Sequence, residues 1–322
     1  MTTPVSPLDC LCTGLLVADH ICEPIQRLPE PGELIVTPRM ELSVGGCGAN
    51  VAVDLARLGR RTAIAGAVGD DIFGEFLSKS LQRAGVDTSP LAVIPDCDSS
   101  GSLVINSAGE DRRFIHSVGA NAYFTATSVD LALLQAAKVV YLGGYLLCPE
   151  LTAASVRQMF ETARQAGAIT VLDVVLSGPG DYRPQLETVL PVTDVFLPNN
   201  DEARLLTGLD DPVEQARFLQ QLGAQTVIIT CGESGSVTAH PGGLLHAARF
   251  EVPLVDGTGS GDAFAAGFIH GLIDNLPLAD CLHRGAALGA SVVTRAGATT
   301  GALTRPELDD FLASHPLQSK PL

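Results

Sequence analysis

The stretch that decides the fold is residues 255–268, Val-Asp-Gly-Thr-Gly-Ser-Gly-Asp-Ala-Phe-Ala-Ala-Gly-Phe. Its glycines alternate with small residues, and Asp262 stands where a helical apolar pattern begins. Glycines let successive backbone N–H groups point into one concavity, and a helix N-terminus adds partial positive charge, so the stretch predicts an anion site. A carboxylate beside an anion is explained if it takes a hydroxyl proton next to a phosphate. Alone, the stretch is equally consistent with a glycine turn in which Asp262 is the helix N-cap.

Composition narrows the classes of protein that this chain can be. It has 322 residues, of which 46% are hydrophobic and 17% charged, as expected for a soluble globular protein with a large core. A net charge of −16 argues against nucleic acid or an anionic membrane as the main partner. No apolar run reaches the ~18 residues of a membrane-spanning helix, and no basic segment precedes an apolar one at the N-terminus.

The eight cysteines contain no CxxC pair and no cluster with zinc-ligand spacing. They are therefore predicted to be mostly buried free thiols in a reducing compartment, and a cytoplasmic location is expected.

The order of predicted elements favours an α/β fold. From residue 129 onward strands and helices alternate, which predicts parallel strands with right-handed crossovers. The first strand is predicted over Leu8–Val17, which places Asp19 just past its carboxyl end, where open α/β sheets put ligand-contacting groups. A simple turn aspartate is the equal alternative. A second glycine-rich entry to a helix follows at residues 45–50, with Gly59 as the predicted stop.

Two separated segments are predicted to form one small sheet beside the core. Residues 21–44 contain four prolines and a weak alternation around residues 34–36, which indicates edge strands. Residues 99–107 and 112–117 are predicted to form a hairpin whose turn is residues 108–111. A small sheet in this position is a natural lid, so the chain is predicted to be one domain, residues 1–322, with a lid from about 20–44 and 99–118.

Several enzyme classes are excluded by missing motifs. The chain lacks the P-loop GxxxxGK[ST], the HRD and DFG motifs of protein kinases, HExxH, and the Rossmann GxGxxG with its distant acidic residue. The sequence around Ser260 fails the hydrolase GxSxG spacing, because Thr258 occupies the first glycine position.

Two further motifs follow predicted strands. Asn199 and Glu202 lie one turn apart, where a carboxylate suits hydrated Mg²⁺, although first-turn helix capping is the better explanation of these two residues alone. The turn at residues 230–235 is able to hold ATP phosphates or ribose, although alone it is only a hairpin signal.

Taken together, these motifs resemble the PfkB carbohydrate kinase family, the ribokinase-like sugar and nucleoside kinases. The resemblance covers nearly the whole chain. It is carried by Gly45-Gly46 with Asn50 and the Leu55–Gly59 segment, Gly69-Asp70-Asp71-x-x-Gly74, Gly119-Ala120-Asn121-Ala122, Asn199-x-x-Glu202, Thr230-x-Gly232-x-x-Gly235, and Asp256-Gly-Thr-Gly-Ser-Gly-Asp262.

The resemblance implies a three-layer αβα core with a mainly parallel sheet and a β-sheet lid. It implies that Asp262 is the general base and that the N–H groups of Gly259, Ser260 and Gly261 form an anion hole. ATP would be contacted by Asn199, Thr230, Gly232, Gly235 and Gly261, with Mg²⁺ organised by Asn199 and Glu202, partly through water. The substrate would be contacted by Asp19, Gly45, Gly46, Cys47, Gly48, Asn50, Tyr145 and Asp262. A K⁺ site would use Asp256 with backbone carbonyls near Thr258, Val292, Arg295 and Gly297, and lid strands would pair in a homodimer.

Three positions depart from ribokinases proper, which resemble this chain but have Asn, Lys and Glu where it has Val17, Cys47 and Tyr145. Losing three polar groups predicts a more apolar pocket and argues against ribose. The expected acceptor is a neutral sugar or a sugar acid, with a nucleoside as the alternative and a non-catalytic sugar-binding regulator as a third hypothesis. On the lid, Arg112 and Arg113 are expected to be solvated, the alternative being a contact with an anionic substrate group.

Overall fold

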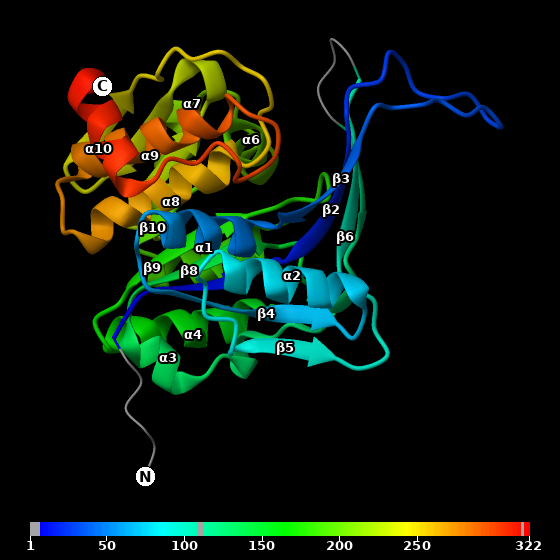
Figure 1. Ribbon diagram of the computed structural model, residues 1–322. Coiled ribbons are helices and arrows are strands. Elements are labelled where there is room, and N and C mark those ends of the chain that lie inside the picture. The colour runs from blue at the N-terminus through cyan, green and yellow to red at the C-terminus, as the bar shows by residue number, and fades with distance from the viewer. Residues whose placement is uncertain (1–6, 108–112, 317–318) are drawn as a thin grey trace.

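The computed structural model describes residues 7–107, 113–316 and 319–322, and its main feature is a ten-stranded sheet covered by helices on both faces (Figure 1). The strand order is β14-β13-β12-β11-β10-β9-β8-β1-β4-β5, and the seven strands from β11 to β5 run parallel. The strands of this sheet are β1 (Leu8–Gly14), β4 (Thr62–Gly69), β5 (Leu91–Ile94), β8 (Ala137–Tyr145), β9 (Ile169–Val174), β10 (Val195–Phe196), β11 (Thr226–Thr230), β12 (Ser236–His240), β13 (Gly243–Ala247) and β14 (Ser319–Pro321).

Alternating side chains of the central strands feed two separate cores. On β1, Leu11 packs into one core while Cys10 and Cys12 pack into the other, which is why the strand reads as an unbroken apolar run. The first core is covered by α3 (Leu131–Ala136), α4 (Ala153–Gln165), α5 (Arg183–Val189), α6 (Asn200–Thr207) and α7 (Pro212–Gln221). The second is covered by α1 (Cys47–Arg57), α2 (Ile72–Arg83), α8 (Ser260–Ile273), α9 (Leu278–Val292) and α10 (Arg305–Ser314). The predicted three-layer αβα core is confirmed.

The predicted small sheet is also confirmed, and it stands beside the core in Figure 1. Its strands are β2 (Val17–Cys22), β3 (Met40–Gly45), β6 (Gly101–Ile105) and β7 (Arg113–Ser117), in the order β3-β2-β6-β7. The β2–β6 pair is parallel, while β2–β3 and β6–β7 are antiparallel. The pairing of β2 with β6 joins two segments that are far apart in the sequence.

Three details of the sequence prediction need correction. The first strand ends at Gly14, whose φ of 111° breaks it, and a second strand starts at Val17. Asp19 therefore lies within β2 of the small sheet and not past the end of a core strand. Leu34 and Val36, each 82% exposed, belong to no strand, because the nearby prolines remove ladder donors. The predicted turn 108–111 and Arg112 lie outside the described residues.

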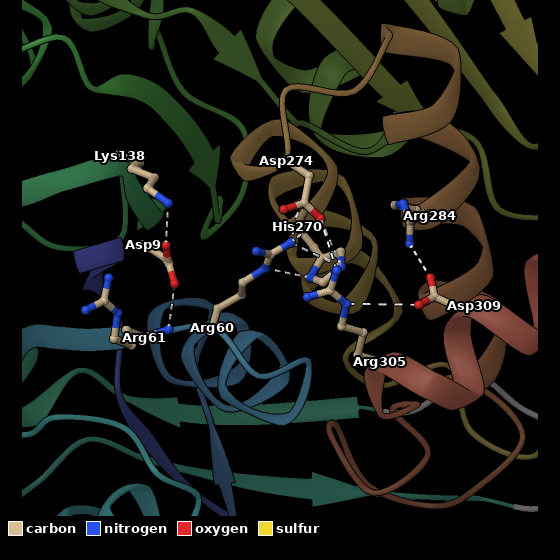
Figure 2. A network of polar contacts seen from close by, with 9 residues as sticks. All are labelled: Asp9, Arg60, Arg61, Lys138, His270, Asp274, Arg284, Arg305 and Asp309. Carbon is tan, nitrogen blue, oxygen red and sulfur yellow. Dashed lines mark hydrogen bonds and ion pairs between the residues drawn. The ribbon is translucent and has the colours of Figure 1, made fainter. Parts of the chain in front are cut away.

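A buried polar network fixes α8 to the chain that follows α1 (Figure 2). The Arg60 Nε donates to His270 Nδ1 over 2.9 Å, and its Nη2 lies 2.5 Å from Asp274 Oδ2. His270 is fully buried, and burial together with the charge of Arg60 lowers its pKa to about 4. Because α8 also carries Asp262, the network holds the helix that presents this carboxylate.

All eight cysteines are free thiols, and five of them are buried, as predicted. Within the described part of the chain, no helix combines the length and apolar character that crossing a bilayer requires.

Candidate active site

The first turn of α8 is open to an anion. Its N-cap is Gly259, whose φ of 76° is in the left-handed region, and a Cβ there would lie 2.1 Å from the carbonyl oxygen of Ala298. Only glycine fits this close approach. An added Cβ on Gly261 would meet no atom of the described residues within 4 Å, so these residues leave space next to the helix N-terminus. Asp262 is the third residue of α8, and the alternative in which it is the N-cap is wrong.

A second glycine-led helix meets α8 at Asp262. Gly46 is the N-cap of α1 with φ 88°, and a Cβ on it would lie 2.6 Å from the carbonyl oxygen of Leu15. This close approach brings Asn50 to α8, where its Nδ2 donates to Asp262 Oδ2 over 2.7 Å. Asn50 is 4% exposed, and its Oδ1 has no hydrogen-bond partner among the described residues. An unpaired buried acceptor beside a carboxylate marks a place for a ligand donor.

The Cys47 thiol and the Asp173 carboxylate complete the surroundings of Asp262. One ligand atom from each of the three residues lies within 4.8 Å of the other two. Burial raises the pKa of Cys47 well above its usual range, and Asp262 and Asp173 add to this effect, so the thiol is neutral.

Asp173 was missed by the sequence analysis as a site residue. It ends β9 beside Val174, is 8% exposed, and accepts from the Tyr141 hydroxyl over 2.9 Å. Burial raises its pKa strongly, and the negative charges of Glu202 and Asp262 raise it further. The available signal was its place at the carboxyl end of a predicted parallel strand, where ligand sites of open α/β sheets lie.

Asp19 approaches the same site from the small sheet. Its carboxylate lies against Gly45, since a Cβ on Gly45 would be 1.9 Å from Asp19 Oδ2. Asp19 is 7% exposed. Burial raises its pKa to about 6, the Ser102 hydroxyl opposes the rise, and the charge of Asp262 adds to it. The electrostatic coupling places Asp19 and Asp262 at one site.

Tyr145 and Gly48 lie on the elements that border this site. Tyr145 ends β8 at a register irregularity, is 1% exposed, and has a hydroxyl without a partner within the described ranges. Burial raises its pKa to about 12. Gly48 lies in the first turn of α1, where an added Cβ would be 3.0 Å from the carbonyl oxygen of Thr13.

Asn199 and Glu202 form a capping box at the start of α6. Glu202 N–H donates to Asn199 Oδ1 and Asn199 N–H donates to Glu202 Oε2, each over 2.9 Å. The predicted first-turn capping is therefore observed. Glu202 is half-buried and lies near Asp262. Burial and the negative charge of Asp262 raise the pKa of Glu202 to about 7.

The ends of β10 and β11 lie side by side, because Asn199 and Thr230 form a parallel bridge. The chain then turns through Gly232 and Gly235, both with positive φ, into β12. The turn predicted for ATP thus adjoins Asn199.

The Asp256 carboxylate organises the loop that enters α8. Its Oδ1 accepts from the Thr258 N–H and hydroxyl, and its Oδ2 accepts from Gly297 N–H over 3.0 Å. Val292 ends α9, and its carbonyl accepts from Arg295 N–H over 3.2 Å. Asp256, Thr258 and Gly297 are therefore in direct contact, with Val292 and Arg295 in the adjoining turn.

The donor set suits a hard divalent cation. The charges of Glu202 and Asp262 raise the pKa of Asp173, and the charge of Asp262 raises that of Glu202, because like charges repel. A bound cation relieves that repulsion. Carboxylate and amide oxygens are the ligands that Mg²⁺ takes, usually with several waters retained. The residues present fit this ion. For K⁺, Asp256 and the carbonyl-rich turns at 256–258 and 292–297 offer oxygen ligands of the right type.

Comparisons with known proteins point to one family. The model of the pfkB family of carbohydrate kinases matches residues 8–305. The ribokinase of Haemophilus influenzae is 27% identical over 304 residues, covering 93% of this chain and 96% of the relative. The aminoimidazole riboside kinase of Salmonella typhimurium is 30% identical over 283 residues, covering 85% of this chain and 89% of that relative.

Among solved structures, the ribokinase of Arabidopsis thaliana, complexed with ribose and ATP, superposes with a TM-score of 0.82 at 24% identity, covering 96% of this chain and 99% of that one. This likeness establishes the ribokinase fold. Since the family match spans nearly the whole chain and the alignments cover most of each relative, the chain belongs to the pfkB family of carbohydrate kinases.

Proposed function

We propose that the protein transfers the γ-phosphoryl group of ATP to a primary hydroxyl of a small sugar or sugar acid, with Asp262 as the general base. The observation that carries the proposal is the position of Asp262 in the open first turn of α8, held by Asn50 at 2.7 Å. A base in this place takes the hydroxyl proton while the adjacent N–H groups face the transferred phosphoryl group.

The backbone N–H groups of Gly259, Ser260 and Gly261 would stabilise the charge that develops on that group. A preorganised donor of this type is worth about 2.7–4 kcal/mol in barrier height. ATP would lie between this turn and the turn at residues 230–235, a position supported by the bridge between Asn199 and Thr230.

Metal ions would be held at two places. Asn199 and Glu202, partly through water, would hold Mg²⁺, which supplies charge neutralisation on the phosphates. Asp173 would contribute negative charge to the same region. Asp256, with carbonyls near Thr258, Val292, Arg295 and Gly297, would hold K⁺ and so fix the loop that packs against Gly259.

The acceptor would be bound by Asp19, Asn50 and Tyr145 over the backbone of Gly45–Gly48. Val17 and Cys47, whose thiol is neutral, stand where ribokinases have Asn and Lys. They therefore make this pocket less polar than those two hydroxyl-binding side chains would. A nucleoside is the second candidate acceptor, and the 30% identity to an aminoimidazole riboside kinase favours it.

The small sheet would act as a lid of a single kinase domain and as the surface of a homodimer. Leu103 and Ile115, 37% and 63% exposed, are cross-strand neighbours through the β6–β7 pairing and suit an apolar contact with a second copy. Sedimentation velocity of the wild type against Ile115→Glu tests this: a monomeric wild type refutes the dimer.

The experiment for the main proposal is ADP release over a panel of pentoses, hexoses, keto-deoxy acids and nucleosides. A kinase releases ADP with at least one acceptor well above the acceptor-free rate. If one acceptor binds by calorimetry and none raises ADP release, the protein is a sugar-binding regulator instead.

A further inference from the structure

A row of four polar side chains crosses the small sheet at one level. Asp19 on β2 is directly opposite Ser43 on β3 and Ser102 on β6, and Ser102 is directly opposite His116 on β7. Directly paired residues of neighbouring strands point to the same face of a sheet. His116 therefore shares a face with Asp19, although no local sequence motif connects the two residues.

That face is the one turned toward the active site. On the opposite face of β2, His20 packs edge-on against Phe73 of α2, with ring centroids 5.1 Å apart. Asp19 points the other way, where the charge of Asp262 raises its pKa. The row from Ser43 to His116 is consequently on the substrate side of the sheet, and Ser102, like Asp19, is 7% exposed.

The hydrogen bonds along the row fix the proton on His116. The Ser102 hydroxyl donates to the Asp19 carboxylate, which is ionised above a pH of about 6 because its pKa is raised to that value. A hydroxyl has one proton, so Ser102 Oγ must accept from its other neighbour, His116 Nδ1, 3.0 Å away. Burial lowers the pKa of His116, so its ring is neutral and carries a single proton, on Nδ1. Nε2 is then a bare acceptor.

This acceptor is unused among the residues that the structure describes. His116 Nε2 is buried and has no hydrogen-bond partner in the described part of the chain. A buried acceptor without a partner is unfavourable, and a ligand donor removes that cost. Because strands are about 4.8 Å apart, the β7 backbone at His116 lies roughly 10 Å from the β2 backbone at Asp19.

We propose that His116 is a specificity-determining residue whose Nε2 accepts a hydrogen bond from a substrate hydroxyl distal to the one that is phosphorylated. The partner is a donor and not an anion, since an ionised carboxylate or phosphate dianion has no proton to give, and on a sugar or sugar acid that donor is a hydroxyl. The inference rests on the proposed function and deepens it: the acceptor substrate extends under β7 and carries a free hydroxyl there.

The test uses the full-length protein and the best acceptor found by ADP release, together with its monodeoxy analogues. Wild type is expected to reject one analogue, altered away from the phosphorylated carbon, by about tenfold or more in kcat/KM. His116→Asn keeps an amide near the Nδ1 position, for Ser102, and lacks the distal acceptor. The His116→Asn variant should prefer the parent acceptor over that analogue by only about twofold in kcat/KM. The change should come chiefly from a higher KM for the parent acceptor. His116→Gln, which returns an amide oxygen to the distal position, should restore part of that preference.

Ser117→Ala is the matched control, because Ser117 neighbours His116 on β7 but faces the other side and is exposed. It should keep wild-type discrimination. Unchanged discrimination in His116→Asn, or an equal loss for the parent and every analogue, overturns the inference while the kinase proposal stands. A wild type that releases no ADP with any acceptor refutes the proposed function, and the inference with it.

A second measurement is independent of turnover. The imidazole ¹⁵N spectrum, with His116 assigned by its loss in His116→Asn, must report a protonated Nδ1 and a bare Nε2 at neutral pH. The opposite tautomer removes the acceptor and contradicts the inference.

Discussion

The side chain of Asn50 donates from Nδ2 to Asp262 Oδ2 over 2.7 Å. This bond between residues 212 positions apart joins the first turns of two helices that each begin after a glycine N-cap. Both helices begin at a glycine with positive φ that packs against another backbone, Leu15 for α1 and Ala298 for α8. The two close approaches aim the amide at the carboxylate. The amide donor restricts the rotation of the Asp262 carboxylate, which suits the general base proposed above.

Asp262→Asn should lower kcat by about 10²–10⁴-fold, because the amide cannot take the hydroxyl proton. ATP binding should change little, since the N–H groups of the α8 turn are untouched. ADP release with the best acceptor and calorimetric titration of ATP measure the two effects separately. Near-normal turnover in this variant contradicts the assignment of Asp262 as base.

The sequence sufficed to predict the parallel core, because each central strand is a continuous apolar run that alternates with a helical pattern. It also sufficed for the glycine-rich starts of α1 and α8, which require glycine at Gly46 and Gly259 for steric reasons. The hairpin signal at residues 230–235 is confirmed by the antiparallel pairing of β11 with β12. The next strand, β13, was not predicted, since its pairing partner, and not its own residues, determines it.

Candidate site residues can be named from the sequence where a local motif contains them, as for Asp262 and Asn199. Asp173 lacks such a motif and became visible only when β9 placed it beside Cys47 and Asp262. His116 depends on register across two strand pairs, which a linear pattern does not encode. Asp19 was predicted as a site residue but on the wrong element, because Gly14 divides the first apolar run into two strands.

Asp19→Asn should stabilise the protein at alkaline pH. Folding raises the pKa of this carboxyl from 3.8 to about 6, so the folded state holds the proton more tightly and wild-type stability falls as pH rises through that window. Above pH 6 the ionised buried group costs the folded state up to about 3 kcal/mol, a cost that the amide avoids. Urea unfolding at pH 4 and pH 8 should give similar stabilities at the lower pH and a more stable variant at the higher. A difference independent of pH would show that ionisation of Asp19 is not its cause.

Arg60→Met should destabilise the protein by about 2–4 kcal/mol at pH 7.5, because Asp274 loses its main partner and Arg60 is itself nearly buried. Arg305→Met is the control: its guanidinium is also near Asp274, at 3.9 Å, but is 55% exposed, so the loss should stay below about 1 kcal/mol. Chemical denaturation of both variants provides the comparison, and equal losses would refute the role of the buried network.

The same network makes the stability of the folded protein decrease at acid pH. The pKa of His270 falls from 6.5 to about 4 on folding, so the unfolded state binds a proton first and wild-type stability declines as pH drops through that window. In Arg60→Met one of the charges that lowers this pKa is gone, and the decline between pH 6.5 and 4 should be shallower. Parallel slopes for wild type and variant would mean that burial alone determines the titration of His270.

Replacing K⁺ by a large organic cation should slow turnover if the Asp256 site is occupied during catalysis. Asp256 connects Thr258, just before the α8 turn, with Gly297, next to the Ala298 carbonyl that lies against Gly259. A cation held there would therefore fix the N–H groups of the anion hole without touching substrate. Asp256→Asn keeps an oxygen acceptor for the Thr258 N–H but removes the charge, so it should lower kcat in K⁺ and abolish the difference between the two cations. Steady-state ADP release in both salts measures this, and ion-independent turnover of the wild type would exclude a catalytic K⁺ at Asp256.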